Sequence, residues 1–99
     1  MTDIDLSQND LNNFGANQIA GILKKFTKIK TCDISSNGIG SDGMQKICSG
    51  LCNENSKLEH LDIQDNPISD KSLKMLMAML LHNTSILEIN YTLKEANNI

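Results

Sequence analysis

Apolar residues occupy every second position in four short segments of the chain. The apolar pairs are Ile4 and Leu6, Cys32 and Ile34, Leu61 and Ile63, and Ile89 and Tyr91. A period of two is typical of a short strand with one buried side. After each of the first three segments, apolar residues recur with helical spacing, at Ala16, Ile19, Ala20 and Leu23, at Met44, Ile47, Cys48 and Leu51, and at Leu73, Leu76, Met77 and Leu80. Strands that alternate with helices predict a parallel sheet with the helices on one face.

The segments belong to an internal repeat that is marked by an asparagine. Asn9, Asn37 and Asn66 are separated by 28 and 29 residues, and the residues around them align as IDLSQNDL, IKTCDISSNGI and LEHLDIQDNPI. A fourth start, ILEINYTLK, has Lys94 where the asparagine is expected, so we expect the repeats to stop there. One unit of this length cannot bury its own apolar face, and stacked units therefore share a core.

The repeat resembles the leucine-rich repeat, whose pattern is L-x-x-L-x-L-x-x-N-x-L. Its period, and the N-x-I-G-x-x-G run that begins at Asn37, resemble the ribonuclease-inhibitor type. The resemblance implies an α/β solenoid: a short right-handed superhelix with a parallel sheet on the concave side and helices on the convex side. We expect one domain over residues 1–99, with repeats at about 3–28, 29–57 and 58–85 and a partial C-terminal repeat at 86–99.

The recurring asparagine has a local physical reason. The chain turns sharply after each strand, which leaves backbone N–H and C=O groups without partners in the sheet. A side-chain amide carries both donors and an acceptor, so one buried asparagine satisfies several such groups. We therefore predict that Asn9, Asn37 and Asn66 are buried and structural.

The charge balance favours a protein partner over a nucleic acid or a membrane. Nine Lys, no Arg and twelve acidic residues give a net charge of −3, whereas nucleic-acid binding requires a basic face. No apolar run is long enough to span a bilayer, and the start, MTDIDLSQND, lacks the features of a secretory signal. We expect a cytoplasmic protein, or one of the host-cell cytoplasm if it is a bacterial effector, in which Cys32, Cys48 and Cys52 are free thiols.

Two motifs imitate functional sites, a glycine run and a group of cysteines, and the repeat explains both. The run from Gly38 to Gly43 reads G-x-G-x-x-G, but the aligned segments DLNNFG and PISDKS lack these glycines, so we expect no dinucleotide. Cys32 and Cys48 stand at core positions, so we expect no metal. His60 and His82 belong to no arrangement of nucleophile, base and orienting group, so we expect neither a cofactor nor catalysis.

The sheet face that points away from the helices is the main candidate for function. Alternate strand residues point to this face, and on it we expect one column of Asp5, Asp33, Asp62 and Asn90, flanked by others with Asp3, Thr31, His60 and Glu88 and with Ser7, Ser35, Gln64 and Thr92. None of these is a lysine, so the face is acidic and favours a basic partner. The candidate partner-binding residues are Asp5, Asp33, Asp62, His60, Glu88, Gln64 and Asn90. Asp in this position is also common among ribonuclease-inhibitor-type repeats, so a scaffold role stays open.

A second candidate surface lies on the third predicted helix. There Met75, Met79 and His82 form a stripe beside the expected core positions. It is either an adaptable patch for a partner or a second copy, or it packs against the tail from Leu93 to Ile99 or a neighbouring helix. The first repeat begins with no capping element before it, so we also expect an open strand there that pairs with another chain.

The leading functional hypothesis is a non-catalytic module that binds a partner protein through its concave acidic face. One alternative is a self-assembling structural piece, or a fragment of a longer solenoid, that forms homo-oligomers through uncapped ends. The other is a GTPase regulator, by resemblance to the Ran GTPase-activating family, against which the absence of Arg counts.

Overall fold

The computed structural model of the chain describes residues 2–52, 56–83 and 85–92. Its elements follow in strict alternation. They are β1 (Asp3–Asp5), α1 (Asn12–Lys25), β2 (Thr31–Asp33), α2 (Ser41–Leu51), β3 (His60–Asp62), α3 (Asp70–Leu80) and β4 (Glu88–Asn90). The predicted alternation of strand and helix is therefore confirmed.

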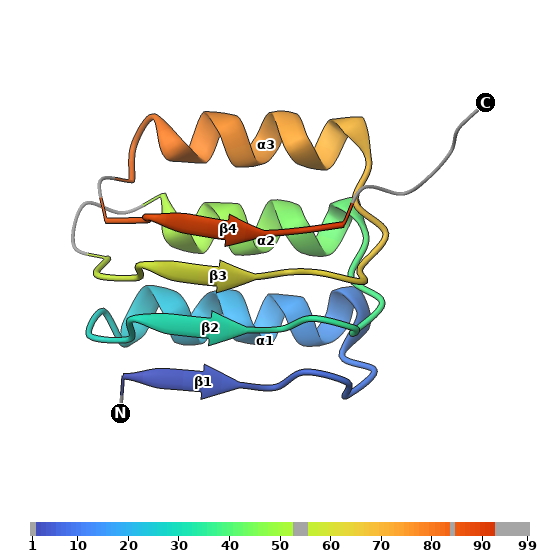
Figure 1. The fold of residues 1–99 in the computed structure, drawn as a ribbon, viewed down its shortest axis with the longest axis horizontal. Helices are drawn as coiled ribbons and strands as arrows, with labels where there is room; N and C mark the ends of the chain where they lie inside the picture. Colours follow the sequence, from blue (N-terminus) through green and yellow to red (C-terminus); the bar gives the residue numbers. More distant parts are fainter. Residues whose placement is uncertain (1, 53–55, 84, 93–99) are drawn as a thin grey trace.

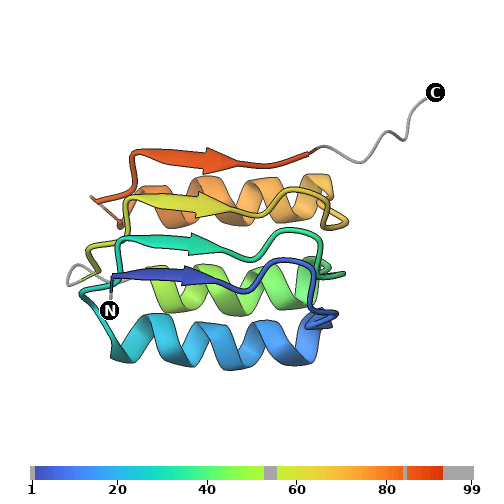
Figure 2. The ribbon, with the colours of Figure 1, turned by 60° about the horizontal axis from the view of Figure 1, so that its bottom comes forward.

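The four strands form one parallel sheet in the order in which they occur in the sequence (Figure 1). The three helices lie in a second layer on one side of this sheet, and the other side has no covering element among the described residues (Figure 2). We call that side the open face. The arrangement is the predicted leucine-rich-repeat solenoid, in which each strand–helix unit packs on the next.

The core lies between the two layers, and the apolar columns of the sequence fill it. All eight expected core positions of α1 and α2 are buried, and so are the strand residues Cys32, Ile34, Leu61 and Ile63. At the other end of the sheet the prediction for α3 is partly wrong. Met77 is 68% exposed and Leu80 42% exposed, whereas Met79, which is not among the expected core positions, is only 3% exposed. Met77 and Leu80 do lie on the inward repeat positions, but no following helix covers them among the described residues.

Small residues let α1 and α2 approach closely. A Cβ atom on Gly50 would lie 2.7 Å from the carbonyl oxygen of Ala20, and one on Gly43 would lie 2.9 Å from the Cβ of Ala16. Only a residue without a side chain fits so near to another helix. Since each helix is positioned by its neighbour, this packing fixes the spacing of the strands that carry the open face.

The glycine run at the start of α2 is a packing and turn motif, as the repeat indicated. Gly38 has a φ of +67°, which favours glycine, and it makes the turn after β2. The backbone N–H groups of Gly40 and Gly43 donate to Oδ1 of Asn13, at 2.8 and 2.9 Å. A side chain of α1 thus accepts the hydrogen bonds that a phosphate would accept in a dinucleotide site.

No helix among the described residues is long and apolar enough to cross a membrane.

Candidate functional site: the open face of the sheet

The open face presents the predicted columns of side chains in register. Asp5 pairs with Asp33, Asp33 with Asp62, and Asp62 with Asn90. We call these four residues the central column. Neighbouring strands are about 4.8 Å apart, so three carboxylates stand side by side across the first three strands.

Hydrogen bonds to the following turn fix the orientation of the aspartates. Oδ1 of Asp5 accepts from the backbone N–H and the hydroxyl of Ser7, at 3.1 and 2.8 Å. Oδ1 of Asp33 makes the same pair of bonds with Ser35, at 3.0 and 2.7 Å. The hydroxyl bond of Ser7, and then its backbone bond, lower the pKa of Asp5 below its ordinary value. The two carboxylates are therefore held in the same orientation.

Asp62 repeats this arrangement on the third strand. Its Oδ1 accepts from the backbone N–H of Gln64 at 3.0 Å, although Gln64 offers no hydroxyl. No described residue donates a hydrogen bond to Oδ2 of the three aspartates. Each carboxylate therefore has one oxygen that accepts from its own turn and one that accepts from no described residue. The bonds at Oδ1 also give the scaffold role of these residues a physical basis.

Side chains of the neighbouring column pair across strands. The hydroxyl of Thr31 donates to Oδ1 of Asp3 at 2.6 Å. Nδ1 of His60 lies 3.1 Å from Oε1 of Glu88, and both side chains are about half exposed. These exposed pairs contribute little to stability, but they orient His60 and Glu88, and a partner that binds them competes with this contact.

A shallow hollow of about 190 Å³ lies on the open face over β2, β3 and β4. Its lining includes Asp33, His60, Asp62 and Asn90. Pockets for small organic ligands and cofactors usually measure about 300–1,000 Å³ and are mostly apolar. The hollow is smaller and acidic, so it suits an inserted cationic side chain better than a cofactor.

The asparagine prediction is confirmed for two of its three members. Asn37 is 0% exposed and Asn66 4% exposed, and the side chain of each bonds to backbone groups of its own repeat and of the repeat before it. Asn9 is exposed, so the prediction that it is buried is wrong. Its Nδ2 still donates to the carbonyls of Leu6 and Ser7, at 2.9 and 3.1 Å, but no earlier repeat covers it among the described residues.

The sequence analysis missed a further structural asparagine. Asn83 is 5% exposed, its Nδ2 donates to the carbonyl of Leu51 at 2.9 Å, and its Oδ1 accepts from the N–H groups of Ser85 and Ile86. It orients the loop that leads into β4. The sequence does carry a signal for it: with the 28-residue shift that aligns His60 with Glu88, Asn83 corresponds to Asn55 of the preceding unit.

The stripe on α3 is not the exposed patch of the first alternative, and the burial of Met79 agrees with the packed alternative. Met79 is buried against the core and Met75 is half-buried, so of that stripe only His82 is exposed. The exposed apolar residues at the end of α3 are instead Met77, Leu80 and Leu81. The expected packing partner, the tail from 93 to 99, lies outside the described residues.

The cysteines are free, and two of them are part of the core. Cys32 and Cys48 are buried and Cys52 is exposed. Burial raises the pKa of Cys32 to about 12 and that of Cys48 to about 11, so both remain neutral thiols at neutral pH. Within the described ranges, no group of three or more His, Cys, Asp or Glu side chains is placed to hold a metal ion.

The stacked units, the single parallel sheet and the asparagine contacts between units define a leucine-rich-repeat fold. The family model for the leucine-rich repeat matches residues 27–48 and 54–77, the second and third units of the solenoid. The ribonuclease-inhibitor subtype remains a prediction from the repeat period.

The chain is similar in sequence to parts of several longer proteins. The chain is 28% identical over 92 residues to a protein phosphatase 1 regulatory subunit 37 homolog of Caenorhabditis briggsae, and 25% identical over 87 residues to FERM domain-containing protein C of Dictyostelium discoideum. It is 27% identical over 93 residues to the human NACHT, LRR and PYD domains-containing protein 3. These matches cover 88–90% of the chain but only 6–10% of each relative.

A solved structure has the same fold. The structure of Leiomodin-1 Actin-Binding Site 2 superposes with a TM-score of 0.85 at 18% identity, over 99% of this chain and 56% of that one. The likeness extends over all of the units described above, and at this identity it concerns the fold alone.

Proposed function

We propose that the chain is a non-catalytic protein-interaction module whose open face binds a basic segment of a partner protein. The observation that carries the proposal is the central column, in which the carboxylates of Asp5, Asp33 and Asp62 stand in register, each with one oxygen that accepts from no described residue. The names of two similar proteins support a protein partner: one is an actin-binding site of leiomodin-1, and the other is a homolog of a phosphatase regulatory subunit.

Electrostatics favours a cationic partner on this face. Two like charges about 5 Å apart in water repel each other by roughly 1 kcal/mol, and more where water is excluded. No lysine on the described strands compensates the column; the described lysines lie on the helices and in the loops. A partner that places ammonium or guanidinium groups between the carboxylates relieves this repulsion and gains charge-assisted hydrogen bonds.

The hydrogen bonds between the aspartates and the following turns allow the charge of the central column to be removed without changing its geometry. Replacing each of the three aspartates with asparagine keeps an oxygen that can accept from the turn N–H and hydroxyl groups, while it removes the charge. The fold and the shape of the face are then retained. Binding to a fluorescently labelled oligolysine peptide, measured by anisotropy, therefore reports on the charge of the column.

We expect the triple Asp→Asn variant to bind the peptide roughly tenfold or more weakly, since three exposed ion pairs at about 0.2–1 kcal/mol each are lost. The matched control replaces Asp10, Asp42 and Asp70 with asparagine, because these exposed residues lie off the open face and change the net charge equally. The control is expected to bind nearly as well as the wild type. Equal losses in both variants, or no loss in either, would contradict the proposal.

A further inference from the structure

The two ends of the solenoid expose repeat positions that are buried inside it. On the α3 side, Met77 is 68% and Leu80 42% exposed, whereas their equivalents in α2, Cys48 and Leu51, are 6% and 0% exposed. The residue types are apolar in both repeats. The difference is that α3 packs over Cys48 and Leu51, while no described helix packs over Met77 and Leu80.

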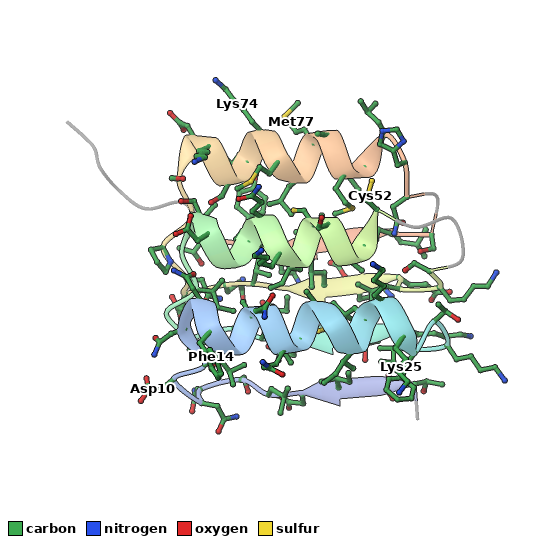
Figure 3. All side chains as sticks on the ribbon, turned by 180° about the vertical axis from the view of Figure 1, so that it is seen from behind. Asp10, Phe14, Lys25, Cys52, Lys74 and Met77 are labelled. Atoms are coloured by element: carbon green, nitrogen blue, oxygen red, sulfur yellow. The ribbon has the colours of Figure 1, made fainter. Side chains whose placement is uncertain are left out.

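The C-terminal end face consists of α3 and β4, and its apolar residues surround a hollow of about 350 Å³. Its lining includes Leu73, Met77, Leu80, Ile89 and Tyr91. Figure 3 shows Met77 and Lys74 on the outer side of α3, away from α2.

The N-terminal end face consists of β1 and α1 and has a larger hollow of about 740 Å³. Its lining includes Ile4, Leu6, Ile22, Phe26 and Ile29. Phe26 is 54% exposed, and Nζ of Lys25 lies 5.6 Å from the centre of its ring. Lys25 and Phe14 lie at this end of the molecule, opposite α3 (Figure 3).

The outer edges of β1 and β4 carry the backbone groups that would extend a regular pattern of hydrogen bonds between neighbouring strands. Within the chain, the N–H two positions after the middle residue of a strand donates to a carbonyl of the next strand. The three instances are Leu6 to Asp33 at 2.8 Å, Ile34 to Asp62 at 2.9 Å, and Ile63 to Asn90 at 2.8 Å. The next donor in this series is the N–H of Tyr91, on the outer edge of β4. The acceptor that precedes the series is the carbonyl of Asp5, on the outer edge of β1.

We propose that copies of this chain stack head to tail, with the C-terminal end face of one copy against the N-terminal end face of the next. In this arrangement β4 runs parallel to β1 of the second copy, Ile89 lies beside its Ile4, and Tyr91 donates to the carbonyl of its Asp5. The junction continues the interface that already joins consecutive repeats within the chain. A second copy is the occupant because this one chain carries both an apolar donor edge and an apolar acceptor edge in the same register.

The same register places two negative charges side by side at the junction. Since β3 pairs His60 with Glu88, a following β1 places its Asp3 beside Glu88. Two carboxylates are then adjacent at the junction. Within one chain, by contrast, Asp3 pairs with the hydroxyl of Thr31 and Glu88 pairs with the imidazole of His60. We therefore expect Glu88→Gln to strengthen assembly several-fold, and added salt to strengthen assembly of the wild type.

The geometry predicts open chains of copies and not closed pairs. A contact between two different faces generates a linear or helical array unless its rotation closes a ring. The mass of the wild-type protein should therefore grow with concentration beyond two copies, as measured by sedimentation or light scattering. A mass that stays at one chain at every concentration would overturn the proposal.

Blocking one end at a time separates head-to-tail stacking from other associations. Leu80→Lys blocks the C-terminal end face and Phe26→Lys the N-terminal one. Both substitutions add a positive charge near a helix C-terminus, where the helix dipole favours it. Leu81→Lys is the matched control, because Leu81 is 82% exposed and lies outside the lining of the hollow. Circular dichroism melting checks that each variant is folded.

We expect Leu80→Lys and Phe26→Lys each to be a single chain, and the control to assemble like the wild type. An equal mixture of the two blocked variants should form complexes of two chains and no larger ones, because one free N-terminal face meets one free C-terminal face. A mixture that stays at single chains, or a blocked variant that forms pairs by itself, would overturn head-to-tail stacking. Weaker assembly of Glu88→Gln would overturn the proposed register.

Discussion

The side chain of Asn37 provides the sharpest test of how the repeats are held together. It is fully buried, and its Oδ1 accepts from the N–H groups of Asn9 and Leu11, at 2.8 and 3.2 Å. Its Nδ2 donates to the carbonyls of Leu6 and Ser35, at 2.9 and 3.0 Å. Three of these four groups belong to the first repeat, so Asn37 joins two units. Asn37→Leu keeps the branching of the side chain and removes all four bonds.

The expected cost follows from the groups left without partners. An unsatisfied buried donor or acceptor costs about 1–3 kcal/mol, and the lower end applies here because these bonds lie at a partly exposed edge of the core. Allowing for water at one of the four groups, we expect a loss of about 3 kcal/mol in the free energy of unfolding. At about 4–8 °C per kcal/mol for a domain of this size, the melting temperature falls by roughly 12–24 °C.

Asn9→Leu is the internal comparison, because its side chain is exposed and bonds only to two carbonyls of its own repeat. We expect it to cost about 1 kcal/mol or less. The assay is urea unfolding followed by circular dichroism at low protein concentration, where self-association does not add to stability. If Asn37→Leu costs no more than Asn9→Leu, the reasoning about bonds between repeats is refuted.

Three further predictions concern the buried thiols and the helix glycines. Only Cys52 should react quickly with a thiol reagent at pH 8 in the folded protein, because burial raises the pKa of Cys32 to about 12 and of Cys48 to about 11; three fast-reacting thiols would contradict this. Since these raised values favour the folded state below the ordinary thiol pKa of 9.0, stability should fall as the pH rises from there towards 11 and 12. Gly50→Ala should lower the melting temperature, because its Cβ would lie 2.7 Å from a backbone oxygen of α1. Gly21→Ala, where no atom lies within 4 Å, should instead stabilise the protein by about 0.5–1 kcal/mol, and a gain at both glycines would show that the helices separate easily.

The repeat made the fold predictable from the sequence. A period of 28–29 residues fixes which positions of one unit correspond to those of the next, so the strand registers and the open-face columns followed directly from the alignment. Corresponding positions such as Ile34 and Ile63 are buried in the same way. The orientation of Asp33 by Ser35 was not predicted, because the D-x-S spacing alone does not show that both donors reach one oxygen.

The wrong predictions concern residues at the ends of the solenoid, where a repeat has a neighbouring repeat on one side only among the described residues. Asn9 has the correct sequence position but is exposed, and Met77 has a core position but is exposed as well. Alignment predicts which way a side chain points and not whether another unit covers it. Met79 was not expected in the core for a different reason: it corresponds to Gly50, where the sequence shows no apolar residue in the preceding helix to mark the position as buried.

The most direct test of the central claim is to map where a basic ligand contacts the protein. Titration of the ¹⁵N-labelled protein with the oligolysine peptide, followed by two-dimensional NMR, reports on each backbone amide. The account predicts that the largest changes fall on β2 and β3 and on the turn amides of Ser35 and Gln64, whose hydrogen bonds end on the central carboxylates. Changes confined to the helices or to the two end faces, with the strand amides unmoved, would contradict it.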